Sequence, residues 1–219
     1  GYGAGMHRLL REIQCGEDWQ ERAQSLFGGQ GSFGNGAAMR VAPLGAFFAD
    51  DLEVVVAQAA RSAVVTHAHE EAAAGAIAVA AAAAQAWRLR SSGARPSRSE
   101  FLDLVLASIP ESEVRSKVRQ ARDMTPTASV ELAVSVLGNG SCVSAQDTAP
   151  FALWCAGERL ADYEEALWLT VSGLGDRDTT CAIVGGIVAL YTGLDGIPKE
   201  WHKSREELPT WLLKESPVA

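Results

Sequence analysis

An alanine-rich block at residues 70–90 constrains the fold of this chain more than any other segment. It reads EEAAAGAIAVAAAAAQAWRLR, and we predict a helix because alanine has the highest helix propensity. Its small side chains allow neighbouring helices to approach closely. Its most apolar window, residues 72–87, is shorter than the ~20 strongly apolar residues that a bilayer requires. We therefore expect a buried helix and no membrane partner.

Helical periodicity also dominates the rest of the chain. Apolar residues at positions 6, 9, 10 and 13 share one helix face. We expect residues 1–219 to form a single all-α domain, a compact orthogonal helix bundle. Residues 128–138 suit a strand or a helix equally well. Further helices are expected at 37–48 (with Pro43 as a kink or a second start), from a cap at Asp50 or Asp51 to 66, at 100–109 after a cap at Ser99, and at 112–122, 148–157, 163–171 and 180–191.

Composition restricts the class of partner. The chain has 219 residues, a formal charge of −8 and 47% hydrophobic residues. This acidic balance argues against a nucleic acid or an anionic membrane as a partner held by bulk charge. The four cysteines are far apart and show no CxxC spacing. We expect four free, mostly buried thiols in a reducing compartment, the cytoplasm.

The segment GLGDRDTTCAIVGGIVAL, residues 173–190, places Asp176 and Asp178 directly before an apolar run. In an extended turn, residues i and i+2 point the same way, so the two carboxylates could converge next to a helix that begins near Thr180. Two close carboxylates repel each other, and a hard divalent cation with oxygen ligands is the usual remedy. The alternative is that Asp178 or Thr179 caps the helix while Arg177 offsets the charge.

A second unusual segment, GGQGSFGNG at residues 28–36, has five glycines in nine residues and is expected to be a loop. A glycine loop that runs into a helix exposes backbone N–H groups, which suits a phosphate or a pyrophosphate; an ordinary flexible turn is the alternative. Ser32 and Asn35 could add hydrogen bonds to a ribose or phosphate. Arg40, one turn further on, could be a surface charge or a buried clamp.

Two histidines occur in VVTHAHEEA, residues 64–72. HxH can bind a transition metal, but no third nitrogen or sulfur ligand is near in the sequence. His67 therefore suits a cap or a ligand contact, and His69 suits a solvated position.

The order of these segments resembles the ADP-ribosylglycohydrolase family over essentially the whole chain. The resemblance implies an all-α fold with a two-metal Mg²⁺ or Mn²⁺ centre that opens the glycosidic bond at the distal ribose of ADP-ribose. It implies an ADP-ribosylated protein or a small ADP-ribose conjugate as the partner. The segments that carry it are GSFGNGAAMRVAPLG (31–45), THAHEEAAAGA (66–76), PFALWCA (150–156), GLGDRDTTCAIVGGIVALYTG (173–193) and IPKEW (197–201).

Site residues carry over from this resemblance at the matching positions. The GDxDT match implies that Asp176, Asp178 and Thr179 are metal ligands, and the TH match makes His67 a ligand contact. The GNGAAMR match implies a groove for ADP-ribose that is lined by Ser32, Gly34, Asn35 and Gly36, with Met39 and Arg40 following on the helix.

One family feature is missing. Family members carry an early GD…E motif and a later Thr-Asp-Asp-Thr motif with the remaining metal ligands and the catalytic acid; no Thr-Asp-Asp-Thr occurs here. We expect those acidic residues upstream of Gly1, so that the domain is N-terminally incomplete and half of the ligands are missing. Three explanations remain open: a longer enzyme, a second polypeptide that carries the motif, or loss of catalysis.

Two other functional classes stay open. A non-catalytic ADP-ribose-binding or regulatory module would keep the groove without the reaction. A haloacid-dehalogenase-type phosphotransferase would use Asp176 as a nucleophile, but its motif must follow a buried strand in a parallel sheet.

Overall fold

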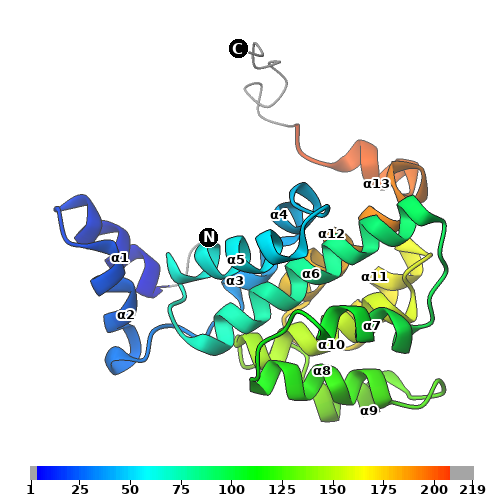
Figure 1. Cartoon of the computed structure of the whole chain (residues 1–219), viewed down its shortest axis with the longest axis horizontal. Coiled ribbons are helices and arrows are strands. Elements are labelled where there is room, and N and C mark those ends of the chain that lie inside the picture. Colours follow the sequence, from blue (N-terminus) through cyan, green and yellow to red (C-terminus); the bar gives the residue numbers. More distant parts are fainter. Residues whose placement is uncertain (1–3, 208–219) are drawn as a thin grey trace.

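A computed structural model describes residues 4–207 as an all-α protein (Figure 1). Within this range there is no strand beyond a single bridge between Gly34 and Ser144, which excludes the parallel sheet of a haloacid dehalogenase. Within residues 128–138, which suited a strand or a helix, the structure has a helix over Val130–Leu137. The elements are α1 (Ala4–Gln14), α2 (Trp19–Gly29), α3 (Gly36–Met39), α4 (Ala42–Phe47), α5 (Leu52–Val64), α6 (Glu70–Ser92), α7 (Arg98–Leu106), α8 (Glu113–Asp123), α9 (Val130–Leu137), α10 (Ala145–Glu158), α11 (Tyr163–Ser172), α12 (Arg177–Thr192), the 3₁₀ turn η1 (Leu194–Gly196) and α13 (Lys199–Ser204).

The alanine-rich helix α6 is the centre of the bundle. It packs against α3, α4, α5, α7, α8, α10 and α12, which surround it in Figure 1. Residues 74–86 are buried without interruption, so the helix is apolar on all sides, as expected of a core helix. By length and composition α6 could cross a membrane, but 78% of its most apolar window is buried inside the protein. The prediction of a buried helix is confirmed.

Small residues bring the neighbouring helices close to α6. A Cβ added at Gly45 of α4 would lie 2.9 Å from Ala80 Cα, and one added at Gly75 would lie 2.9 Å from Ala145 Cβ of α10. Real Cβ atoms are not found at such distances. Larger side chains at these positions would therefore force α4 and α10 away from the core helix.

The helix starts follow their capping residues. Pro43 lies in the first turn of α4, so it marks a second start and not a kink. Asp51 caps α5 by accepting hydrogen bonds from two backbone amides of the first turn, at 3.0 and 3.1 Å. The prediction of Ser99 as the cap of the next helix is wrong. Ser97 caps α7, because its hydroxyl and the Glu100 carboxylate form a reciprocal capping box.

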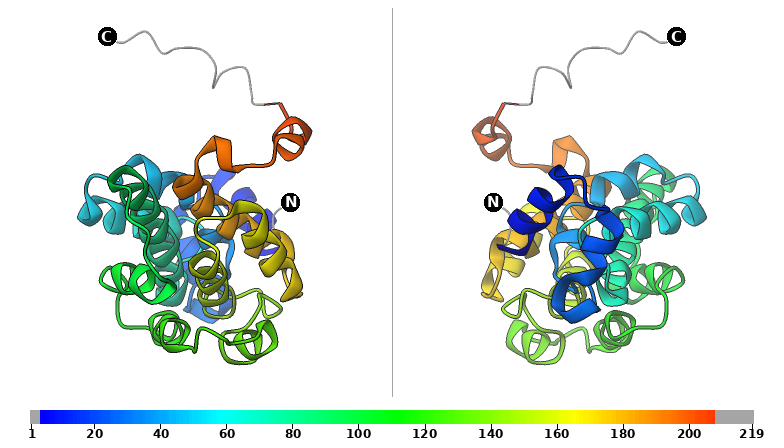
Figure 2. Two further views of the ribbon diagram at one scale, coloured as in Figure 1. Left: turned by 90° about the vertical axis from the view of Figure 1, so that its right-hand side faces the viewer. Right: turned by 90° about the vertical axis from the view of Figure 1, so that its left-hand side faces the viewer.

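The N-terminal pair α1 and α2 projects from one side of the bundle (Figure 1; Figure 2, right). These two helices pack mainly on each other. The backbone of α2 leaves the helical region at Leu26, Phe27 and Gly28. The last turn of α2 therefore opens directly into the glycine-rich loop.

All four cysteines are free. Cys155 is buried and Cys181 is half-buried, whereas Cys15 and Cys142 are exposed. The prediction of mostly buried thiols is wrong, because the two exposed cysteines follow α1 and occupy a loop, outside the packed core.

Candidate functional site

Three loops meet at the N-terminal ends of α3, α10 and α12. The Asn35 amide, in the glycine-rich loop, donates to the Val143 carbonyl in the α9–α10 loop at 3.2 Å. The Asp176 amide, at the start of α12, donates to the Asn139 carbonyl of the same α9–α10 loop at 3.2 Å. The α9–α10 loop therefore joins the two segments that the sequence singled out.

The side chain of Asn35 links the same elements more directly. Its Nδ2 donates to Asp176 Oδ2 at 2.8 Å and to Thr148 Oγ1 of α10 at 3.0 Å. Only 4% of the Asn35 residue surface is exposed. A buried amide with two good acceptors holds both of them in place, so the glycine-rich loop and the acidic turn are parts of one site.

The acidic turn differs from the geometry expected from sequence. The helix begins at Arg177, three positions before Thr180, and Asp176 is its N-cap, accepting from the Thr179 amide at 3.4 Å. Asp178 therefore lies in the first helical turn and not two residues along an extended strand. The i, i+2 argument for convergence is wrong, and so is the alternative that Asp178 or Thr179 caps the helix, because the cap is Asp176.

The carboxylates of Asp176 and Asp178 nevertheless interact with each other. Partial burial acts to raise the pKa of Asp176. Interactions with the side chains of Asp178, Asn35 and Thr179 outweigh the burial, so the pKa of Asp176 lies below its ordinary value. Asp178 is exposed, whereas Thr179 is 5% exposed and its hydroxyl lies 4.0 Å from Met39 Sδ.

The donor set of this turn suits a hard cation. Two carboxylates and a hydroxyl are all oxygen donors, and Mg²⁺ is commonly held by one or two carboxylates with the rest of its shell from water or substrate. Residues 4–207 contain no group of three histidine, cysteine or acidic side chains that could hold a metal ion. The described residues thus fit one cation through Asp176 and Asp178, and they do not form a closed metal cage.

His67 packs under the glycine-rich loop. A Cβ added at Gly36 would lie 2.9 Å from His67 Cε1, and one at Gly34 would lie 3.2 Å from His67 Nε2. Thr66 Oγ1 lies 2.7 Å from the other ring nitrogen, Nδ1. Burial, and to a smaller extent the charge of Arg40, lower the pKa of His67 to about 4. The imidazole is therefore neutral at pH 7.

Arg40 is exposed and is not a buried clamp, but it does hold the segment beside His67. Its Nη2 donates to the Ser62 carbonyl at 2.9 Å and to Thr66 Oγ1 at 2.9 Å. The C-terminal end of α5 is thereby fixed to the helix that follows the glycine-rich loop.

Some of the loop's own amides are already used. The Gly34 amide donates to Ser32 Oγ at 3.2 Å, and the Asn35 amide donates to Val143 as described above. These bonds set the shape of the loop, so they are not available to a phosphate. Fewer backbone N–H groups are therefore available to a phosphate than the number of glycines suggests.

An aromatic pair borders the loop, which the sequence reading missed. The rings of Phe27 and Phe33 have centroids 5.9 Å apart, and Phe27 is 65% exposed with a φ of 54°. The ring of Phe33 also meets that of His69 edge-on at 5.5 Å. His69 accepts from the Glu71 amide as the N-cap of α6 and is half-buried, so the prediction of a solvated histidine is wrong.

The structure brings every predicted site residue into one neighbourhood. Ser32, Gly34, Asn35 and Gly36 form the loop, and His67 packs against it. Met39 lies near Thr179 of the acidic turn, and Arg40 binds the end of α5 that precedes His67. Asn139 and Thr148 are further site residues that were not expected from the sequence, although Asn139 lies between two glycines in LGNGS, residues 137–141. No pattern in the sequence shows that Thr148 faces Asn35 across 113 positions.

Comparisons with known proteins identify the family of this chain. A family model described as ADP-ribosylglycohydrolase matches residues 1–217. ADP-ribosylhydrolase ARH3 of Homo sapiens is 30% identical over 234 residues, covering 94% of this chain and 63% of its own length. The Danio rerio protein of the same name is 29% identical over 239 residues, with 94% and 62% covered.

A solved structure titled "ADP-ribosylglycohydrolase-related protein complex" shares the fold. Its TM-score is 0.62 at 25% sequence identity, and the match covers 93% of this chain and 64% of that one. The chain thus spans slightly less than two thirds of the length of these relatives.

Proposed function

Because the chain belongs to the ADP-ribosylglycohydrolase family, we propose that it binds ADP-ribose attached to an acceptor and takes part in hydrolysis of the glycosidic bond at the distal ribose. The observation that carries this proposal is the hydrogen bond between Asn35 and Asp176. It places a glycine-rich loop, suited to phosphates, against an acidic turn, suited to a cation and to a reacting sugar.

The glycine-rich loop would hold the diphosphate and the adenosine. A side chain at position 34 or 36 would collide with His67, so the two glycines let the loop pack closely on this histidine. Phe27 offers an exposed aromatic face, supported by Phe33, on which a purine base can stack. His67 is neutral at pH 7, so it would contact the ligand as a packing or hydrogen-bonding group and not as a cation.

The acidic turn would hold the cation. Asp176, Asp178 and Thr179 would bind Mg²⁺ or Mn²⁺, which when bound would polarise a water or a ribose hydroxyl and stabilise charge as the bond breaks. Asn35 orients one of the two Asp176 oxygens and leaves the carboxylate anionic, which is the form that binds a metal. A second metal ion and a general acid would need further acidic ligands, which a second polypeptide could supply.

The acceptor in this proposal is an ADP-ribosylated protein or a small ADP-ribose conjugate. Both relatives named ADP-ribosylhydrolase support this class of substrate. Four free cysteines support action in a reducing compartment such as the cytoplasm.

A second candidate function is ADP-ribose binding without catalysis. The observation that favours it is that the described part of the chain holds no group of three metal-binding side chains. In that case the groove would serve recognition, and the acidic turn would serve mainly to cap α12.

Calorimetry and an activity assay together separate the two candidates. Titration with ADP-ribose, with and without Mg²⁺ or Mn²⁺, should show binding that is tighter with the metal, and an ADP-ribosylated protein should release ADP-ribose. Binding that is independent of metal, with no release, would favour the non-catalytic module. Absence of any ADP-ribose binding would reject both.

A further inference from the structure

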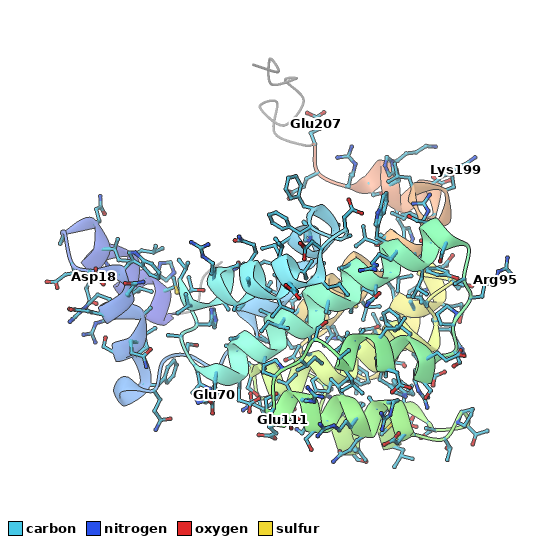
Figure 3. All side chains as sticks on the ribbon, viewed as in Figure 1. Asp18, Glu70, Arg95, Glu111, Lys199 and Glu207 are labelled. Atoms are coloured by element: carbon cyan, nitrogen blue, oxygen red, sulfur yellow. The ribbon has the colours of Figure 1, made fainter. Side chains whose placement is uncertain are left out.

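A cavity of about 780 Å³ lies at the end of α6 that is remote from the candidate site. It is formed by the α6–α7 connection, the end of α10 and the turn that follows, and Tyr191 of α12. None of the site residues described above lines it. In Figure 3 the labelled Arg95 marks this end of the molecule, and Glu70 marks the opposite end of α6.

Four arginines line this cavity: Arg90, Arg95, Arg98 and Arg159. The acidic residues in the lining, Glu158 and Asp162, are both engaged. Glu158 forms an ion pair with Arg98, and Asp162 accepts from the amide of Glu165 as the cap of α11. Four arginines and two carboxylates leave this lining net positive, although the whole chain has a formal charge of −8.

Arg98 is built into the cavity wall. Its side chain is 8% exposed, and it donates to Glu158 and to the Met124 carbonyl. Its Nε is fully buried and has no hydrogen-bond partner among the described residues. A Cβ at Gly157 would lie 2.8 Å from Arg98 Cγ, so the absence of a side chain there makes room for the arginine stem.

Arg90 and the connecting segment are also held in place. The guanidinium of Arg90 lies over Gly193, where a Cβ would be 2.6 Å from Nη1. The Tyr191 hydroxyl donates to the Ala94 carbonyl at 2.7 Å, which fixes the chain just before Arg95. The fold thus holds Arg98 and the backbone next to Arg95 in place, whereas the side chains of Arg90, Arg95 and Arg159 are exposed.

We propose that this cavity binds a small oxyanion with at least two negative charges, a phosphate or a phosphate ester. Arginine binds phosphate through paired N–H groups, and several arginines favour a multiply charged anion over a single carboxylate. The volume falls within the range of about 300–1,000 Å³ that is typical of small-molecule sites. Because α6 has 23 residues, the two sites lie on the order of 30 Å apart.

The site is independent of the proposed ADP-ribose groove, and its test does not require activity. Inorganic phosphate and pyrophosphate, titrated separately into the whole chain by calorimetry, should both bind, with pyrophosphate tighter. The double variant Arg90→Gln/Arg95→Gln should weaken binding at least tenfold. Arg88→Gln is the control, because it removes one positive charge from α6 outside the cavity lining and should leave the affinity unchanged.

Backbone amide NMR locates the anion. Phosphate should shift the amide signals of Gly93, Ser97 and Gly157 and leave the amide signals of Gly34 and Gly36 unchanged. Shifts centred on Gly34 and Gly36, an equal effect of Arg88→Gln, or acetate binding as tightly as phosphate would each overturn the proposal. The single variant Arg95→Glu, at an exposed position, repeats the test if the double variant unfolds at a lower temperature.

Discussion

Asn35 Nδ2 lies 2.8 Å from Asp176 Oδ2, although 141 positions separate the two residues along the chain. The same nitrogen also donates to Thr148 Oγ1. One buried amide therefore fixes the relative position of α3, α10 and α12 at the place where their N-terminal ends meet.

Asn35→Ala should destabilise the protein and weaken its affinity for ADP-ribose. The substitution leaves a carboxylate and a hydroxyl without their shared donor, which we expect to lower the free energy of unfolding by about 1–3 kcal/mol. Urea unfolding measures the first effect and calorimetry the second. Ser25→Ala, at an exposed position with a local hydrogen bond only, is the control; equal effects of the two would contradict the bridging role.

Gly36→Ala should push the His67 ring out of place. A methyl group there would lie 2.9 Å from His67 Cε1, so the loop or the ring must shift, and we expect at least a tenfold loss of ADP-ribose affinity, about 1.4 kcal/mol. Gly5→Ala in α1 is the matched control, because nothing lies within 4 Å of the added carbon. It should leave the affinity unchanged and raise stability by about 0.5–1 kcal/mol. A Gly36→Ala protein that binds normally would show that the contact with His67 has no role in binding.

His67 should make stability depend on pH. The pKa of His67 is 6.5 in the unfolded chain and about 4 in the folded protein. Between pH 6.5 and pH 4 the unfolded state therefore binds more protons than the folded state. The free energy of unfolding should therefore fall as the pH drops from 6.5 to 4, by up to about 3 kcal/mol from this group, and be insensitive to it above pH 7. Urea unfolding of the parent protein and of His67→Gln across this range gives the difference. A parallel pH dependence in both proteins would rule out His67 as the source.

The acidic turn should bind Mn²⁺. Asp176→Asn and Asp178→Asn should each weaken Mn²⁺ binding, measured by electron paramagnetic resonance, at least tenfold, because each removes one anionic ligand. Asp195→Asn removes an exposed carboxylate beyond the other end of α12 and should leave the affinity for Mn²⁺ unchanged. Mn²⁺ affinity that survives both substitutions in the turn would place the metal elsewhere.

Two serines at the start of α7, only two positions apart, have different structural roles. Ser97→Ala should lower the free energy of unfolding by about 1 kcal/mol, because it removes the cap and half of the capping box. Ser99→Ala, inside the same helix and exposed, should stay within about 0.5 kcal/mol of the parent. Chemical denaturation measures both, and the reverse order would contradict the assigned cap.

Much of the fold could be predicted because local patterns set it. The alanine block predicted the core helix, and Asp51, one of the two expected caps, does cap α5. The start of α7 was misplaced because SSGARPSRS contains several serines, and only the reciprocal contact between Ser97 and Glu100 distinguishes the true cap.

The segments that form the candidate site could be singled out in the sequence, but their geometry could not. The glycine loop and the DxDT segment could each be recognised in isolation. Their meeting point depends on Asn35 reaching Thr148 and Asp176, which is a tertiary contact that no local periodicity encodes. The helical position of Asp178 was missed because the N-cap lies at Asp176, earlier than the apolar run suggests.

The three loops that form the site come from distant parts of the chain, and each is anchored to the other two. A ligand that contacts all three loops would stabilise the whole folded bundle. ADP-ribose should therefore raise the melting temperature of the entire protein and not only order one segment. Thermal unfolding curves in the presence of candidate nucleotides would then screen for the ligand that this site prefers.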